Sequence, residues 1–331
     1  MLQKNRNWKK EHFPVMLKEV LNLCSPEKGG NFLDCTFGSG GYTKEILKYP
    51  NTKVIAIDRD KFTEEKARKL REKYPDRFLY QNEKFSKICK FKNENIDNII
   101  FDLGLSINQI FDETRGFSFN SKNSIDMGMG FNDVSMTDLI NKGSKEKLKS
   151  ILRLYGEEND ASKIVASILN YRKNKEITNS KKLSEIINES KGQRKRKINL
   201  STKSFQAFRM FINQEIKELL EGIICAAKII KPGGKIIVIS FHSIEDRIIK
   251  FFFKNYSKQN KVISRYFPDK KISDEIFENF SKKVLLPSNN EIKKNPASRS
   301  AKLRFAVRGR NKFKNLDEFK NKFKKYTEIL H

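Results

Sequence analysis

The segment Asn31-Phe-Leu-Asp-Cys-Thr-Phe-Gly-Ser-Gly-Gly-Tyr42 decides the fold of this chain. It begins as an apolar run that ends in Asp34 and continues as a glycine-rich loop. Because glycine has no Cβ, such a loop can turn tightly and bring its backbone close to a ligand. A strand, this loop and a following helix are typical of the first unit of a nucleotide-binding α/β sheet.

After this segment, helical patterns at 43–49 and 61–73 alternate with short apolar runs at 53–58, 77–81 and 98–103. Short buried strands that alternate with helices indicate a parallel sheet with helices on both faces. The sequence therefore predicts a Rossmann-like α/β fold. In such a sheet, ligands bind beyond the carboxyl ends of the strands.

The next convincing strand, at 235–241, comes only after about 130 further residues, whereas a simple crossover between parallel strands needs far fewer. The chain between is helical in pattern, at 145–155, 160–172 and 181–189. We therefore predict one discontinuous domain of residues 1–121 and 206–331, interrupted by an inserted all-α domain at 122–205.

The pattern predicts three further elements around the last strands. A single long helix from Ser204 to Ile230 returns the chain to the sheet, and Lys231-Pro-Gly-Gly234 ends it. A strand at 303–307 and a charged terminal helix follow.

The composition favours a polyanionic partner. The 331 residues include 68 Lys and Arg against 40 Asp and Glu, a formal net charge of +28. A protein this basic binds polyanions by releasing their counterions, so nucleic acid is the first partner to consider. Two basic clusters, at 191–197 and 299–310, would contact phosphates. A general richness in lysine is the alternative source of this charge.

The cysteines and histidines suggest no metal. Four cysteines lie far apart with no C-x-x-C pair and only three histidines exist, so we predict neither a zinc site nor a disulfide framework. There is no apolar stretch of signal-peptide length, and no run approaches the roughly 20 apolar residues that span a bilayer. We expect a cytoplasmic protein without a membrane partner. Its oligomeric state stays open, a homodimer included.

Two carboxylates end other strands of the predicted sheet. Asp58 follows Gly40 by about 18 residues, where a carboxylate can accept hydrogen bonds from both hydroxyls of a ribose. The loop reads G-x-G-G rather than the G-x-G-x-x-G that cradles a pyrophosphate, which favours S-adenosylmethionine over a dinucleotide. Asp102 ends the fourth strand, beside the place expected for the transferred methyl group. The alternative role for Asp102 is a helix cap.

Three further segments carry hydroxyl, imidazole or guanidinium groups that packing alone explains poorly: 115–127, 204–209 and 240–247. Their phenylalanines could also be core residues, and Glu245 to Arg247 could be the capped first turn of a helix. From these segments we predict substrate contacts by Phe117, Phe119, Arg209, His242 and Arg247, with a phenylalanine stacking on an extruded base.

Nine segments of the chain resemble, in order, those of the ribosomal small-subunit methyltransferase H family, the MraW-like enzymes: 12–19, 34–42, 56–60, 102–106, 115–119, 155–158, 205–209, 240–247 and 295–300. The resemblance covers nearly the whole chain. It implies a class I S-adenosylmethionine-dependent methyltransferase sheet with an inserted helical domain. The implied activity is that of an rRNA (cytosine-N4-)-methyltransferase, acting on a cytidine in the decoding region (P site) of 16S rRNA in the bacterial small ribosomal subunit.

Carried over by position, the resemblance implies seven contacts to S-adenosyl-L-methionine: Gly40, Gly41, Tyr42, Asp58, Phe85, Asp102 and Gln109. We further predict Asp102 as the catalytic residue that accepts a hydrogen bond from the target amine. The chain departs from the family pattern at Tyr42, where the family usually has His, and at 107–108. Gly128 and Gly130 stand where an Arg and an Asp are common.

Two other functional classes fit part of the pattern. DNA amino-methyltransferases share the sheet, but they usually carry an Asp/Asn/Ser-Pro-Pro-aromatic tetrapeptide where this chain reads Asp102-Leu-Gly-Leu105. A non-catalytic RNA-binding assembly factor would explain the charge. The intact glycine loop and both carboxylates argue against a decayed cofactor site.

Overall fold

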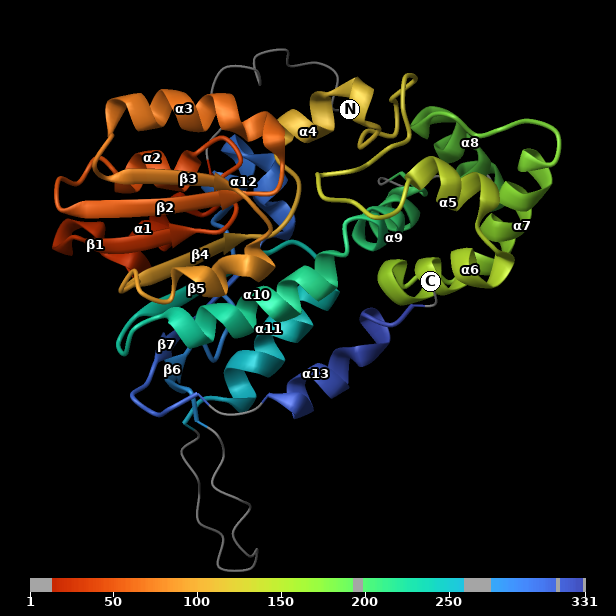
Figure 1. The fold of residues 1–331 in the computed structure, drawn as a ribbon. Coiled ribbons are helices and arrows are strands. Elements are labelled where there is room, and N and C mark those ends of the chain that lie inside the picture. Colours follow the sequence, from red (N-terminus) through yellow and green to blue (C-terminus); the bar gives the residue numbers. More distant parts are fainter. Residues whose placement is uncertain (1–13, 193–198, 259–274, 314–315, 330–331) are drawn as a thin grey trace, which may run out of the picture. The chain divides into compact units, whose positions relative to one another are not determined.

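The computed structural model describes residues 14–192, 199–258, 275–313 and 316–329. Two compact units make up the chain (Figure 1). The sheet unit comprises residues 1–104 and 218–320, and the helical unit comprises residues 105–217 and 321–331. The insertion predicted at 122–205 lies inside the helical unit, which starts directly after the fourth strand.

A seven-stranded sheet forms the centre of the sheet unit, in the order β3-β2-β1-β4-β5-β7-β6 (Figure 1). Strands β1 to β5 pair in parallel, and β7 is antiparallel to both β5 and β6. This confirms the predicted Rossmann-like α/β fold. The bounds are Gly30–Asp34 (β1), Thr52–Asp58 (β2), Phe78–Asn82 (β3), Asn98–Asp102 (β4), Lys235–Ser240 (β5), Phe277–Phe280 (β6) and Lys302–Arg308 (β7).

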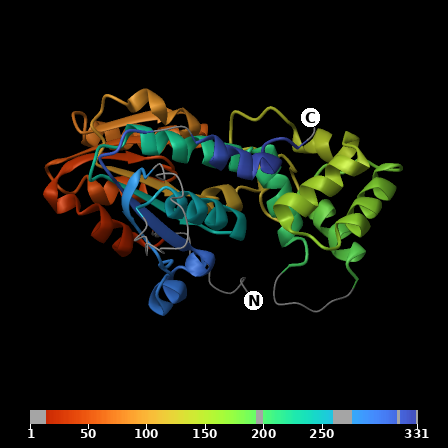
Figure 2. The same ribbon diagram turned by 90° about the horizontal axis from the view of Figure 1, so that it is seen from below.

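Helices cover both faces of this sheet (Figure 2). On one face, Phe32 and Ile100 belong to a buried core with apolar residues of α1, α2 and α3. On the other, the ring of Phe101 meets Phe85 edge-on at 5.5 Å, and Phe85 packs against Gly222. Central parallel strands buried on both sides must be apolar almost throughout, as β4 and β5 are. The helices are α1 (Leu17–Cys24), α2 (Gly41–Ile46), α3 (Glu64–Lys73), the 3₁₀ segment η4 (Phe85–Phe91) and α10 (Glu215–Ile229).

The chain order of the strands creates a switch point. β1 lies between β2 and β4, so the connections leaving β1 and β4 run in opposite directions along the sheet. In open α/β sheets the crevice at such a point is where ligands bind. The structure therefore puts the glycine loop after β1 and the end of β4 at the position expected for a ligand site.

The C-terminal part of the sheet unit holds α11 (Ser243–Asn255) and α12 (Asn289–Lys294), and α13 (Asp317–Phe323) begins in this unit and ends in the helical unit. The terminal helix and the strand β7 confirm the sequence predictions. Strand β6 was not predicted, because its four residues, Phe-Glu-Asn-Phe, lie in a polar stretch and half of them are exposed.

The helical unit contains six complete α-helices within its described residues: α4 (Ile107–Phe111), α5 (Met136–Lys142), α6 (Lys145–Gly156), α7 (Ala161–Arg172), α8 (Ser180–Ser190) and α9 (Thr202–Ile212). Apolar residues at three-to-four spacing bury one face of each longer helix. The Tyr155 hydroxyl of α6 donates a hydrogen bond to the Tyr326 carbonyl at 2.6 Å, which ties the end of the chain to this unit. No helix in the described ranges has both the length and the apolar character to cross a membrane.

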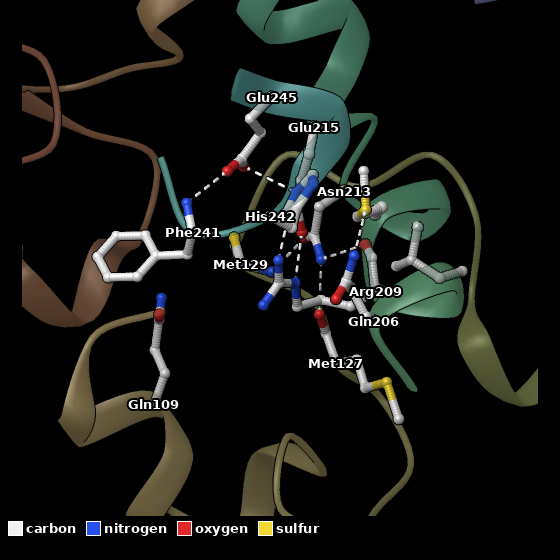
Figure 3. A network of polar contacts seen from close by, with 12 residues as sticks. Gln109, Met127, Met129, Gln206, Arg209, Asn213, Glu215, Phe241, His242 and Glu245 are labelled. Atoms are coloured by element: carbon white, nitrogen blue, oxygen red, sulfur yellow. Dashed lines mark hydrogen bonds and ion pairs between the residues drawn. The ribbon is translucent and has the colours of Figure 1, made fainter. Parts of the chain in front are cut away.

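The prediction of one helix from Ser204 to Ile230 is wrong. α9 ends at Ile212 and α10 begins at Glu215, with Gln214 in the left-handed region at φ 51°. At the break, the Asn213 amide donates to the Met127 carbonyl at 2.9 Å and accepts from the Met129 N–H at 2.8 Å (Figure 3). Tertiary hydrogen bonds thus stabilise a turn at a position where the sequence has neither glycine nor proline.

The prediction that the cysteines form no disulfide is also wrong. Cys89 of η4 and Cys225 of α10 are bonded, with their Cα atoms 5.0 Å apart. The two residues are 136 positions apart in the sequence, and only the packing of η4 on α10 brings them together. Cys24 and Cys35 are free and buried.

Candidate active site at the ends of the parallel strands

Asp34, the last residue of β1, anchors the glycine loop. Its carboxylate accepts a hydrogen bond from the Thr43 hydroxyl at 2.7 Å and one from the Thr36 N–H at 3.2 Å. Burial raises the pKa of Asp34 to about 6, although these hydrogen bonds pull it down. Asp34 is fully buried and therefore closes the loop onto α2, out of reach of a ligand.

Gly40 and Gly41 are required by the shape of this loop. Gly40 has φ 75° and precedes α2, and a Cβ there would lie 2.9 Å from the Phe37 ring. A Cβ on Gly41 would lie 2.9 Å from Pro14. Any side chain at either position would force neighbouring atoms apart, so the loop keeps this shape only with glycine here.

Asp58 ends β2 on one side of the loop. Its Oδ2 accepts a hydrogen bond from the Gly38 N–H at 2.7 Å, and its Oδ1 accepts one from the Asp60 N–H at 2.8 Å. Burial raises its pKa to about 6, against the lowering effect of these two bonds. Each carboxylate oxygen has a second lone pair, so Asp58 can still accept hydrogen bonds from a diol.

Asp102 ends β4 on the other side. Its backbone N–H donates to the Thr36 hydroxyl at 2.8 Å. Its Oδ2 lies 3.3 Å from the Tyr42 hydroxyl, while Oδ1 is buried without a hydrogen-bond partner in the described part of the chain. Burial raises the pKa of Asp102 to about 7. A carboxyl group that has one buried oxygen without a hydrogen bond and a pKa near neutrality is characteristic of a functional site.

Tyr42 lies beneath the loop rather than on it. Its side chain is 3% exposed, and its hydroxyl donates a hydrogen bond to the Val15 carbonyl at 2.5 Å. Burial, together with the negative charges of Asp102 and Asp34, raises the pKa of Tyr42 well above its ordinary value, so the hydroxyl stays protonated. The structure thus ties Tyr42 directly to Asp102.

The segment after β5 forms the first turn of α11, with His242 at the N-cap position but without a side-chain cap hydrogen bond. The Glu245 Oε2 accepts a hydrogen bond from the Phe241 N–H at 3.0 Å, and Glu245 Oε1 lies 3.0 Å from His242 Nε2 (Figure 3). Asp246 pairs with Arg304 at 2.7 Å, and Arg247 is exposed. Of the predicted substrate residues in this segment, Arg247 is the one that faces solvent.

In the helical unit, Gln109 and Arg209 are held by intramolecular partners. The Gln109 side chain accepts a hydrogen bond from the Ser106 N–H at 2.9 Å and completes a capping box of α4. Arg209 forms a two-point ion pair with Glu215, at 2.8 and 2.9 Å (Figure 3). Both residues have a local structural role in addition to any contact with a ligand.

The two predicted stacking residues differ in exposure. Phe117 is 8% exposed, and the guanidinium of Arg115 lies 5.3 Å from its ring. Phe119 is partly exposed and meets the Phe205 ring at 4.9 Å, nearly perpendicular to it. Phe119 is therefore better placed to offer a ring face to a base.

The basic clusters are only partly described. Residues 193–197 of the first cluster, like His12 of the N-terminal motif, lie outside the described residues. In the second cluster, the prediction of phosphate contacts is wrong for two residues. Arg304 is buried against Asp246, and Arg308 is buried and donates to the carbonyls of Ala227 and Ile276.

The sheet unit thus brings together the loop glycines, Tyr42, Asp58 and Asp102, whereas Phe85 packs on the opposite face of β4 from the core of α1 to α3. Sequence reasoning missed Thr36 and Thr43, whose hydroxyls bond Asp102 and Asp34. Both lie in or beside the glycine loop, and a hydroxyl next to a strand-end carboxylate is the signal that could have identified them.

Comparison with known proteins identifies the family of this chain. The model of the MraW methylase family matches residues 9–309. The ribosomal RNA small subunit methyltransferase H of Ehrlichia canis (strain Jake) is 41% identical over 306 residues, covering 88% of this chain and 98% of that protein. The protein of the same name from Rickettsia africae (strain ESF-5) is 39% identical over 298 residues, covering 89% and 97%.

Among solved structures, an rRNA methylase from Streptococcus thermophilus covers 91% of this chain and 100% of its own, with a TM-score of 0.40 and 9% identity. The assignment rests on the sequence matches, which span nearly the whole chain. The chain belongs to the MraW methylase family.

Proposed function

We propose that this chain is an rRNA methyltransferase that uses S-adenosylmethionine, and that its target is the exocyclic N4 of a cytidine in the decoding region (P site) of 16S rRNA. Membership of the methylase family and the names of its relatives support the reaction class. A formal net charge of +28 suits an RNA partner. Work on the small ribosomal subunit would place the enzyme in the cytoplasm.

The observation that carries the proposal is the pair of partly buried strand-end carboxylates, Asp58 and Asp102, on either side of the glycine loop. Burial raises the pKa of each, to about 6 and about 7. S-adenosylmethionine carries a sulfonium and an ammonium, and cations beside these carboxylates would favour their ionised forms. The donor set therefore fits this cofactor.

Individual residues would hold different parts of the cofactor. Asp58 would accept hydrogen bonds from the two ribose hydroxyls. The backbone at Gly40 and Gly41 would lie against the methionine part, and Phe85 would lie beside the adenine. When bound, S-adenosylmethionine supplies an activated methyl group on its sulfonium. Gln109 is proposed as a further contact.

Asp102 would act on the amine that receives the methyl group. The lone pair of a cytosine N4 is delocalised into the ring, so the amine attacks well only if an acceptor helps it to pyramidalise. The Asp102 Oδ1 atom can accept a hydrogen bond from the N–H of this amine. With a pKa near 7, the same carboxylate can take up the proton that the methylated amine loses. The rest of the catalysis is in-line positioning.

RNA contacts are proposed for the inserted helical domain at 122–205 and for five residues outside that range. Phe119 offers a partly exposed ring for stacking on an extruded base, and Phe117, although buried, is proposed as a second contact. Arg247 is exposed and can contact phosphate, and His242 at the start of the same helix is proposed as a further contact. Arg209 would have to share its guanidinium with Glu215.

A methyl-transfer assay tests the substrate class. The protein is incubated with methyl-labelled S-adenosylmethionine and, in separate reactions, with unmethylated small ribosomal subunits, naked 16S rRNA or DNA. We expect label in rRNA, with small subunits as good a substrate as naked rRNA or better. Label in DNA alone would contradict the proposal. Tight RNA binding without transfer would indicate an assembly factor instead.

A further inference from the structure

Tyr42 links three parts of the candidate active site. Its ring belongs to the first turn of α2, directly after the glycine loop. Its hydroxyl reaches the Val15 carbonyl at 2.5 Å and the Asp102 Oδ2 at 3.3 Å. Val15 belongs to the segment that precedes α1, and the next residue, Met16, donates its N–H to Glu291 at 2.6 Å. The hydroxyl therefore has a fixed acceptor on one side and a carboxyl on the other.

The single proton of the Tyr42 hydroxyl can bond either the Val15 carbonyl or Asp102. A tyrosine hydroxyl has one proton to donate and lone pairs with which to accept. While it donates to the Val15 carbonyl, its oxygen can accept a proton from a neutral Asp102. When Asp102 is ionised, the same proton can turn toward the carboxylate. The hydroxyl can thus bond Asp102 in both of its protonation states without moving the ring.

We infer that Tyr42 is a positioning residue for the methyl-transfer reaction: its hydroxyl holds Oδ2 of Asp102, aims the free Oδ1 at the target amine, and supports the ionised carboxylate that accepts the amine proton. The inference rests on the role proposed for Asp102. It assigns to Tyr42 a contact with a protein carboxyl, in place of the cofactor contact that position alone suggested.

The charges around Asp102 make this support necessary. Asp34 on β1 and Glu245 on α11 both face it and raise its pKa, beyond the effect of burial. Tyr42 on α2 is the group that lowers it. Glu291 on α12 acts on Tyr42 itself. Without the Tyr42 hydroxyl, Asp102 would keep two negative neighbours and lose its side-chain donor.

Tyr42→Phe tests the inference, because it removes only the hydroxyl. The carboxyl ¹³C resonance of Asp102, assigned by its absence in Asp102→Asn, is titrated by NMR in the wild-type protein and in Tyr42→Phe. We expect the pKa of Asp102 to rise by about one unit, the size of a weak hydrogen bond to a charged group. Near pH 7 such a shift would reduce the ionised fraction about fivefold.

Tyr80→Phe is the matched control. Tyr80 is also buried, on β3, and its hydroxyl bonds the Thr63 hydroxyl at 2.7 Å. This variant also loses one buried tyrosine hydroxyl, but not at Asp102. We expect its Asp102 titration to match that of the wild type. Thermal unfolding of both variants shows whether either change has disturbed the fold.

The pH profile of kcat supplies the functional readout. With saturating cofactor, the acid limb for Tyr42→Phe should move to higher pH by the same one unit, while Tyr80→Phe should not move it. An unchanged Asp102 titration in folded Tyr42→Phe overturns the inference. If Asp102→Asn keeps full activity, the proposed role of Asp102 fails instead, and the NMR titration still decides whether Tyr42 controls this carboxyl.

Discussion

Asp58 and Asp102 are acidic side chains that the fold partly buries at the ends of two parallel strands. Among the described residues, neither forms an ion pair with a cationic side chain: Asp58 accepts hydrogen bonds from two backbone N–H groups, and Asp102 is bonded by one hydroxyl. Burying a carboxylate in this way is costly unless a partner compensates it. A bound cation with a ribose would be such a partner, which connects the local energetics to the proposed cofactor.

Asp58→Ala should weaken S-adenosylmethionine binding about 10- to 100-fold, since charge-assisted hydrogen bonds contribute about 1.5–3 kcal/mol. Isothermal titration calorimetry measures the change. Asp76→Ala, at an exposed position of the same unit, should bind like the wild type. Equal affinities of Asp58→Ala and wild type would exclude Asp58 from the ribose site.

Asp102→Asn should lower kcat by about 10²–10⁴, the usual contribution of a positioned acid or base. The amide is nearly isosteric with the carboxyl, so cofactor affinity should change far less than kcat. Single-turnover methyl transfer, combined with calorimetry on the same preparation, separates the two effects. A variant with full kcat would remove Asp102 from the chemistry.

At this scale the sequence predicts residue types better than their contacts. Asp58 and Asp102 could be found because a carboxylate at a strand end has a spacing that can be read. The contact between Tyr42 and Asp102 could not, because the two residues lie 60 positions apart and meet only through the sheet. The ion pair of Arg304 with Asp246 could not be predicted for the same reason, and the sequence therefore predicts a phosphate contact for Arg304 instead.

At the scale of elements, the glycine loop makes a separate prediction. Gly40→Ala places a Cβ against the Phe37 ring at a φ of 75°. It should cost stability beyond the roughly 1–2 kcal/mol of left-handed backbone strain, and it should weaken cofactor binding at least 10-fold, about 1.4 kcal/mol. Urea unfolding and calorimetry measure the two quantities.

Gly233→Ala is the matched control for this loop variant. Gly233 has a similar φ of 81°, but no atom of the described part of the chain lies within 4 Å of the position that its Cβ would take. Gly233→Ala should lower the free energy of unfolding only by the cost of the left-handed backbone strain, and its affinity for the cofactor should be unchanged. If both variants bind the cofactor equally well, the close contact at Gly40 has no role in shaping the pocket.

The elements themselves follow largely from the apolar pattern. The parallel strands were predicted to within a few residues, because central strands are continuous apolar runs between turn residues. The break at 213–214 was missed, because side-chain hydrogen bonds from Asn213 replace the usual glycine signal. The Cys89–Cys225 disulfide was missed because it joins segments 136 residues apart.

For the whole molecule, the buried carboxyls predict how stability depends on pH. Burial raises the pKa of Asp58 to about 6 from an ordinary value of 3.8. Between these values the folded state keeps a proton that the unfolded state has lost, so the stabilising effect of the neutral form is lost as pH rises through this window. A shift of this size corresponds to about 3 kcal/mol.

Asp58→Asn, which cannot ionise, should therefore gain up to about 3 kcal/mol relative to wild type between pH 4 and pH 7. Urea unfolding at the two pH values, without cofactor, gives the difference. Asp76→Asn, at an exposed position, should show no comparable gain. A constant difference between Asp58→Asn and wild type would mean that Asp58 is not held neutral in the free protein.

The most direct test of the central claim identifies the methylated nucleoside. Small subunits from cells that lack this activity are incubated with the protein and S-adenosylmethionine, and the 16S rRNA is digested and analysed by mass spectrometry. The account predicts one new methyl group on N4 of a cytidine in the decoding region, and none with Asp102→Asn. A methyl group on adenine, on another position of cytosine, or outside the small-subunit rRNA would contradict it.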